Sequence, residues 1–172
     1  MTPAQITRIQ TKIIKLRKII AAEPARFGGY DDNPGRRYTI LNLYVSIADY
    51  KGASVYLRWF FKNFPDDAGI PFFWVEACMT YFYNKKLDQA RSMAFNAFAC
   101  NPHIWEVFFT GTATEVEGIK PSSNWEGLQL ALQLPYRANQ EQFVDFSSWL
   151  QDCLVEPKMQ DLIHTYFDVL RE

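Results

Sequence analysis

Long apolar runs are missing from this sequence of 172 residues. No stretch approaches the roughly 20 apolar residues that a membrane-spanning helix needs. Near the N-terminus, basic residues interrupt the apolar ones from Arg8 to Lys18. This pattern predicts that the segment is neither a secretory signal nor a membrane span, and we expect no insertion into a membrane.

Cysteine and histidine are scarce. The three cysteines, Cys78, Cys100 and Cys153, lie far apart and are odd in number. They therefore form no disulfide framework, and we expect a reducing, cytoplasmic setting. Neither His103 nor His164 has a cysteine or a second histidine at ligand spacing. We expect no metal and no other cofactor.

Signatures of catalysis are also absent, including the glycine-rich phosphate loops and the G-x-S-x-G elbow. The acidic pairs Asp31–Asp32 and Asp66–Asp67 are adjacent residues in loops, where turn formation and helix capping explain them. The chain is therefore predicted not to be an enzyme. The less favoured alternative is a small-molecule or enzymatic site between helices, around Arg36, Arg37 and Asp31.

The chain has little net charge: 18 Lys and Arg face 19 Asp and Glu, a balance of −1. Arginines near aromatic rings could grip nucleic acid; they are Arg36, Arg37 and Arg58, near Tyr38, Tyr56 and Trp59. A balance of −1 argues against a broad phosphate-binding surface. We instead expect these arginines to lie over apolar surface, with no nucleic-acid partner.

Charge is unevenly distributed along the chain. Residues 1–86 carry 13 basic and 7 acidic residues, whereas residues 87–172 carry 5 and 12. Such asymmetry can mark head-to-tail self-association, although solvated helix faces that differ by chance would explain it too. A self-assembling structural protein, and hence a homo-oligomer, is our second hypothesis.

Aromatic residues are abundant, with 14 Phe, 9 Tyr and 5 Trp, or 16% of the chain. Each ring can bury roughly 150–250 Å², so the chain can build a large core, and disorder is excluded as a description of the whole. The apolar spacing is helical. Over residues 3–22 it forms a single stripe of Ile6, Ile9, Ile13, Leu16 and Ile20.

This first helix is predicted to be capped by Thr2, to have Pro3 in its first turn and to stop before Pro24. A turn-rich loop follows. From Arg37 onward the chain reads as helix after helix, without the alternation typical of strands. The fold class is therefore predicted to be all-α.

Two segments repeat at an offset of 37 residues. Tyr44, Ala53 and Pro65 in the first copy correspond in spacing to Tyr81, Ala90 and Pro102 in the second. A small residue such as Ala53 lets two antiparallel helices approach closely. The proline that follows ends the second helix of each pair.

This pattern resembles the tetratricopeptide repeat, a helix–turn–helix unit of 34 residues. The first copy departs from it at Arg37 and Phe60, and the second places Lys85 in the turn. The resemblance implies one domain over residues 1–172, a right-handed stack of antiparallel helix pairs with capping helices at both ends. Its parts are an N-terminal helix at 3–22, repeats at 34–67 and 71–104, and a degenerate repeat with capping helices at 105–172. Within that last part we expect helices at about 125–134, at 139–154 and from 156 onward.

The resemblance also implies a function, which is the binding of a partner protein or peptide in a concave groove. The residues that would line this candidate groove are Tyr38, Asn42, Phe72, Val75, Met79, Phe82 and Tyr83, with Val45 and Ser46 beside them. Its apolar second half suits an apolar segment of a partner. The alternative left open is that the C-terminal helices fill the groove with Trp125, Phe143 or Trp149.

Overall fold

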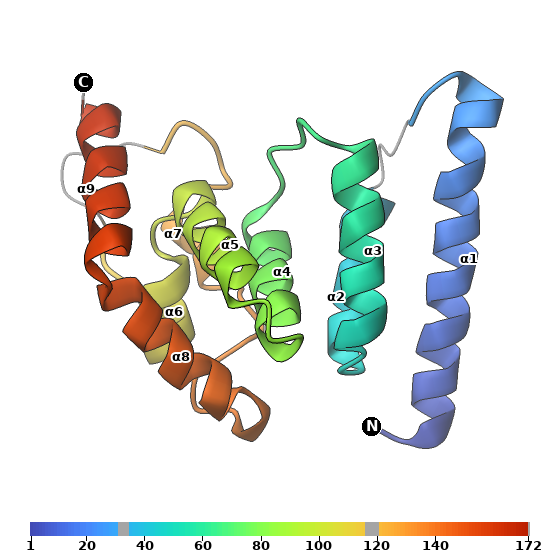
Figure 1. The fold of residues 1–172 in the computed structure, drawn as a ribbon, viewed down its shortest axis with the longest axis horizontal. Coiled ribbons are helices and arrows are strands. Elements are labelled where there is room, and N and C mark those ends of the chain that lie inside the picture. Colours follow the sequence, from blue (N-terminus) through green and yellow to red (C-terminus); the bar gives the residue numbers. More distant parts are fainter. Residues whose placement is uncertain (31–34, 116–120, 172) are drawn as a thin grey trace. The chain divides into compact units, whose positions relative to one another are not determined.

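The computed structural model describes residues 1–30, 35–115 and 121–171. Over these residues the secondary structure is helical, with nine α-helices, one short 3₁₀ helix and no strand, which confirms the all-α prediction (Figure 1). None of the helices in this part of the chain is both long and apolar enough to cross a membrane. The chain divides into two compact units, Met1–Asp67 and Ala68–Glu172.

The first unit begins with α1 (Pro3–Phe27), whose start follows the prediction. The Thr2 hydroxyl accepts a hydrogen bond from the Gln5 backbone, and the Gln5 side chain accepts one from Thr2. The predicted end is wrong, because α1 continues through Pro24 to Phe27. Two structural features explain why α1 continues past Pro24 and where it stops. Glu23, which precedes the proline, is buried and paired with Arg36, and the left-handed Gly28 provides the actual stop.

The rest of the first unit is a helical hairpin of α2 (Arg36–Ser46) and α3 (Tyr50–Asn63), with α1 packed on α2. Tyr56 is fully buried and donates a hydrogen bond to the backbone oxygen of Arg37 at 2.7 Å, which ties α3 to the start of α2. Arg17 on α1 donates to the Tyr44 hydroxyl on α2 at 3.1 Å. The largest buried side chains of this unit are Ile20, Ile40, Leu41, Tyr56, Leu57 and Phe60.

The second unit is built around the hairpin of α4 (Pro71–Tyr83) and α5 (Leu87–Cys100) (Figure 1). It continues with α6 (Ile104–Thr110), α7 (Leu128–Ala131), the 3₁₀ helix η1 (Glu141–Phe143), α8 (Val144–Val155) and α9 (Pro157–Arg171). The final helix starts where expected, with Pro157 in its first turn. Helix α8 packs against α4 and α9 packs against α5, so the C-terminal helices return to the hairpin.

The helix predicted over residues 125–134 is mostly absent, and only Leu128–Ala131 is helical. The reason is a tertiary hydrogen bond. The side-chain amide of buried Asn101 donates to the backbone oxygens of Trp125 at 2.7 Å and Gly127 at 3.1 Å. These two oxygens would be among the first acceptors of the predicted helix. The Gly127 oxygen still begins the short helix, because it also accepts from the backbone N–H groups of Leu130 and Ala131, whereas the Trp125 oxygen accepts from Asn101 and lies outside the helix.

The two hairpins, each described within its own unit, match at the predicted offset of 37 from the end of the first helix to the end of the second. Helices α2 and α4 end at Ser46 and Tyr83, and α3 and α5 span Tyr50–Asn63 and Leu87–Cys100. Both turns contain a non-glycine residue with positive φ, 54° at Ala48 and 60° at Lys85. Two backbone hydrogen bonds to the preceding helix also correspond: Ala48 to Val45 and Asp49 to Tyr44 in the first turn, Lys85 to Phe82 and Lys86 to Tyr81 in the second. The repeat seen in the sequence is therefore a repeat of local structure.

The left-handed turn residue should limit stability. We expect Ala48→Gly to raise the free energy of unfolding by about 1 kcal/mol, because glycine adopts positive φ without the clash that a Cβ atom causes. Urea unfolding followed by circular dichroism measures this change. Ala53→Gly is the matched control in the same hairpin, since it lies inside α3, where glycine should cost about 1 kcal/mol. A loss of stability in Ala48→Gly would contradict the assigned turn.

Candidate functional site: the cleft between α5 and α9

A cleft of about 490 Å³ lies between α5 and α9, within the second unit. Helix α5 presents Asp88, Arg91, Ser92, Phe95 and Asn96 to it. The segment at the start of α9 contributes the rest of the lining, which is Glu156, Lys158, Met159 and Leu162. Spacings of three and four residues place each set on one face of its helix. We call this feature the α5–α9 cleft.

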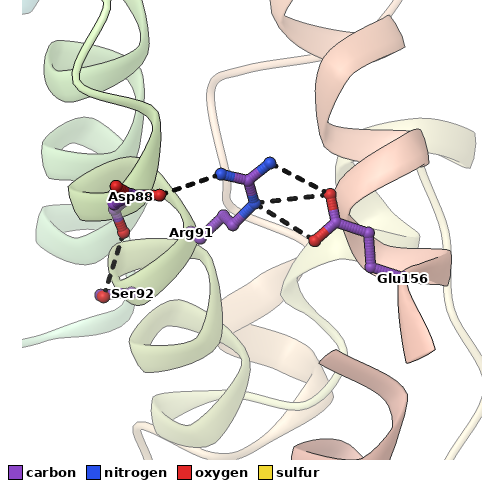
Figure 2. Close-up of polar contacts among 4 residues, drawn as sticks. All are labelled: Asp88, Arg91, Ser92 and Glu156. Atoms are coloured by element: carbon purple, nitrogen blue, oxygen red, sulfur yellow. Dashed lines mark hydrogen bonds and ion pairs between the residues drawn. The ribbon is translucent and has the colours of Figure 1, made fainter. Parts of the chain in front are cut away.

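An ion-pair network closes one side of the cleft (Figure 2). The Arg91 guanidinium donates through Nε and Nη2 to the Glu156 carboxylate, with closest distances of 3.2 Å. Its third nitrogen, Nη1, donates to Asp88 Oδ1 at 3.2 Å. The hydrogen bonds to Glu156 raise the pKa of Arg91. The guanidinium is thus held on three sides by carboxylate oxygens.

Glu156 is positioned by the backbone bend between α8 and α9. Its backbone is extended, as expected for a residue before proline. Its carbonyl oxygen accepts hydrogen bonds from the backbone N–H groups of Met159 and Gln160, so it begins α9. Arg91 therefore holds the point where the chain turns from α8 to α9. Ser92, also drawn in Figure 2, donates from its hydroxyl to the backbone oxygen of Asp88 at 3.1 Å.

The remainder of the cleft is largely apolar. Met159 is buried, Phe95 is half-buried and Leu162 is exposed. The Phe95 ring makes an edge contact with Tyr166, whose hydroxyl donates to the Ala99 backbone oxygen at 2.6 Å. This arrangement offers apolar surface beside the paired Asp88, Arg91 and Glu156, and exposed Lys158 also lines the cleft. It suits an apolar side chain better than an anion.

The predicted groove residues on α4 are mostly covered. Val75 and Met79 have no exposed surface, so no partner can contact them in this conformation. Phe82 is buried against Phe146 and Trp149 of α8, with ring centroids 5.4 and 5.1 Å away. The C-terminal helices thus cover Phe82, as in the alternative stated from the sequence. Of the other two side chains considered for that role, Phe143 packs on Tyr136 and Trp125 is exposed.

Tyr83 and Phe72 on α4 retain some surface. Both are half-buried. The Tyr83 hydroxyl donates to the backbone oxygen of Gln142, next to α8. Burial, together with nearby Asp145, raises the pKa of Tyr83 to about 12. Tyr83 therefore stays protonated and keeps this hydrogen bond at physiological pH.

The groove residues of the first unit lie on α2. Asn42 is exposed and Tyr38 is half-buried. The Tyr38 hydroxyl donates to Asp67, and the Arg37 guanidinium donates to the same carboxylate at 2.7 Å. Burial and the hydrogen bond to Asp67 raise the pKa of Tyr38 to about 12. Asp67 thus ties the chain after α3 to the start of α2.

Two of the arginines considered for nucleic-acid or small-molecule binding, Arg36 and Arg37, are engaged within the first unit, whereas Arg58 is exposed on α3. Arg36 pairs with Glu23 at 3.4 Å, and Arg37 pairs with Asp67 while its guanidinium lies over the Tyr38 ring. The expectation that arginine lies over apolar surface is thus met at Arg37. Asp31, the third residue of the alternative small-molecule site, lies outside the described residues, as does Asp32.

Sequence reasoning missed the α5–α9 cleft. Asp88 and Arg91 stand three residues apart, a spacing that brings them together on a helix. The pairing of Arg91 with Glu156 joins residues 65 positions apart, and no local pattern contains such a contact. In the part of the chain that the structure describes, no group of three or more His, Cys, Asp and Glu side chains could hold a metal ion.

Comparisons with family models, with curated proteins and with solved structures found no match to this chain.

Proposed function

We propose that this chain is a non-catalytic protein-interaction module of the tetratricopeptide-like kind. It binds an apolar segment of a partner protein, and the α5–α9 cleft receives that segment. The observation that carries the proposal is the composition of the cleft, in which Phe95, Met159 and Leu162 lie beside a mutually neutralised Arg91–Glu156 pair.

The tetratricopeptide-like part of the proposal is supported by the two matched hairpins. Equal helix ends, two corresponding turn hydrogen bonds and a positive φ at Ala48 and Lys85 are what a true 37-residue repeat requires. Prolines stand just beyond the end of both second helices, at Pro65 and Pro102. The right-handed stacking of helix pairs in a single domain is our proposal for the arrangement of these elements.

A protein segment fits the cleft because apolar surface surrounded by a polar rim is the usual anatomy of a protein interface. All three guanidinium nitrogens of Arg91 already donate to carboxylates. Two of the five N–H groups remain, but a small anion bound to them would lie next to the Asp88 and Glu156 carboxylates, which repel it. An apolar side chain meets no such repulsion and gains roughly 25 cal/mol for each Å² of surface that it buries.

The setting belongs to the same proposal. We place the protein in a reducing compartment, the cytoplasm. Support comes from the odd number of cysteines and from Cys78, which is fully buried on α4 and whose pKa burial raises well above the usual value. Such a thiol is a structural, unreactive one.

The test is a charge placed in the cleft. Peptides are selected on the wild-type chain from a random library, and their binding is measured by fluorescence anisotropy. Leu162→Glu should weaken binding by about tenfold or more, because a charge would enter the apolar part of the cleft. Leu162 is partly exposed, so the substitution should leave the fold intact.

Val169→Glu is the matched control, because Val169 is exposed on the same helix but does not line the cleft. The affinity of Val169→Glu for the selected peptides should equal that of the wild type. Selected peptides that bind Leu162→Glu and wild type equally would refute the assignment to this cleft. Failure to select any peptide would refute binding of apolar segments.

A further inference from the structure

Helix α1 carries exposed basic side chains that no acid among residues 1–30, 35–115 and 121–171 neutralises. Arg8, Lys12 and Lys15 are exposed and, among the described residues, form no ion pair. The only carboxylate on α1 belongs to Glu23, which is buried and paired with Arg36. We call Arg8, Lys12 and Lys15 the basic face. Exposed Ile14 stands between Lys12 and Lys15 in the sequence, and exposed Ile19 follows Lys15 by about one helical turn.

A stripe of opposite sign runs along η1 and α8 in the second unit. Glu141, Asp145 and Asp152 are exposed, and none of them forms an ion pair within the described ranges. We call these three residues the acidic face. Exposed Val144 and Val155 flank it.

The two faces have the same spacing. The basic face and Ile19 occupy positions separated by four, three and four residues, and so do Glu141, Asp145, Ser148 and Asp152. On α1 this spacing keeps all four positions within one narrow stripe, about 16 Å long. On the acidic side Asp145, Ser148 and Asp152 lie on α8, and Glu141 lies on the preceding 3₁₀ helix η1. Two of the three cations occupy positions that correspond to acids, and the remaining positions are Ile19 and Ser148.

The net charges of the two units have the same signs as the two faces. The first unit holds 11 basic and 6 acidic residues, and the second holds 7 and 13. Each copy of the chain thus carries one basic and one acidic unit. A second copy supplies both complementary surfaces, whereas nucleic acid or an anionic membrane would be repelled by the acidic unit.

We propose that the basic face of α1 in one copy binds the acidic face of α8 in a second copy (both helices are labelled in Figure 1). This is a heterologous contact, which closes a ring or dimer if the geometry returns on itself and otherwise extends into a chain. Charge sets the specificity and the association rate. Contact of Ile19 with Val144 or Val155 adds apolar burial.

The proposal is independent of the partner-binding cleft, since none of the residues of the two faces lines it. Exposed ion pairs are weak individually and are screened by salt. We therefore expect association at low ionic strength that is largely lost at about 500 mM salt. Sedimentation velocity of the full chain at about 1 to 200 µM detects it through the concentration dependence of the mass.

Charge reversal gives the decisive comparison. The first variant carries Arg8→Glu, Lys12→Glu and Lys15→Glu, and the second carries Glu141→Lys, Asp145→Lys and Asp152→Lys. Each variant alone should self-associate at least about tenfold more weakly than wild type. A mixture of the two should associate again, because every reversed face then meets its complement. Circular dichroism checks that both variants are folded, and Lys15→Glu alone should give a smaller loss.

A matched control changes the net charge equally but off the basic face. It carries Lys51→Glu, Arg58→Glu and Lys62→Glu, all at exposed positions of α3. This variant should associate like wild type. The proposal is overturned if the wild type stays monomeric at low salt, if the control loses association equally, or if the mixture fails to associate. Binding of the wild type to anionic vesicles or single-stranded RNA through the basic face, in place of self-association, would also overturn it.

Discussion

Phe146→Ala should lower the free energy of unfolding by about 3–5 kcal/mol, the usual range for removing a fully buried phenylalanine ring. Phe146 on α8 has no exposed surface. Its ring lies against Phe82 of α4 at 5.4 Å and against Phe108 of α6 at 5.7 Å, measured between centroids. Alanine would leave a cavity where three helices meet and would loosen the cover that α8 provides over Phe82.

Urea unfolding measures this loss. Val144→Ala, two residues away on the exposed side of the same helix, should change stability by no more than about 0.5 kcal/mol. If Phe146→Ala lowered the free energy of unfolding as little as Val144→Ala, the packing of α8 on the α4–α5 hairpin described above would be contradicted. An increase in fluorescence of an apolar dye on Phe146→Ala would report the exposed rings directly.

Asn101→Ala should lower the free energy of unfolding by about 2–3 kcal/mol, since a buried polar group left without its partner costs about 1–3 kcal/mol. The Asn101 side chain is fully buried and makes three hydrogen bonds. It donates to the oxygens of Trp125 and Gly127 and accepts from the backbone N–H of His103 at 3.0 Å. Alanine would leave all three backbone groups without this partner.

Asn124→Ala is the matched control, because Asn124 is exposed in the same segment that Asn101 holds. Its stability should equal that of wild type. Hydrogen exchange should also accelerate around residues 125–131 in Asn101→Ala and remain unchanged in the control. Wild-type protection of these residues in Asn101→Ala would contradict the role assigned to Asn101.

The helical elements could be predicted from local patterns. The caps at Thr2 and Pro3, the 37-residue repeat and the start of α9 at Pro157 depend on neighbours a few positions away. The failures occurred where a distant group competes with a local preference. Glu23, paired with Arg36, lets α1 continue past Pro24, and Asn101 binds the Trp125 oxygen that a helix at 125–134 would have used.

The candidate site was predicted less well than the fold, for the same reason. Periodicity correctly indicates which residues of α4 are apolar, but an apolar face looks the same whether it meets a partner or its own chain. Here Phe82 meets Phe146 and Trp149, which follow it by more than 60 residues. The α5–α9 cleft depends on Arg91 meeting Glu156, an equally distant pairing.

The sequence by itself determined that the chain is helical, that two helix pairs repeat, and that one half is basic and the other acidic. These properties depend only on the composition of the chain and on the spacing of residues that are close in sequence. Only the tertiary structure decided which aromatic rings are covered and where an open cleft lies. Burial depends on which surfaces come together after folding, and those surfaces belong to residues far apart in the chain.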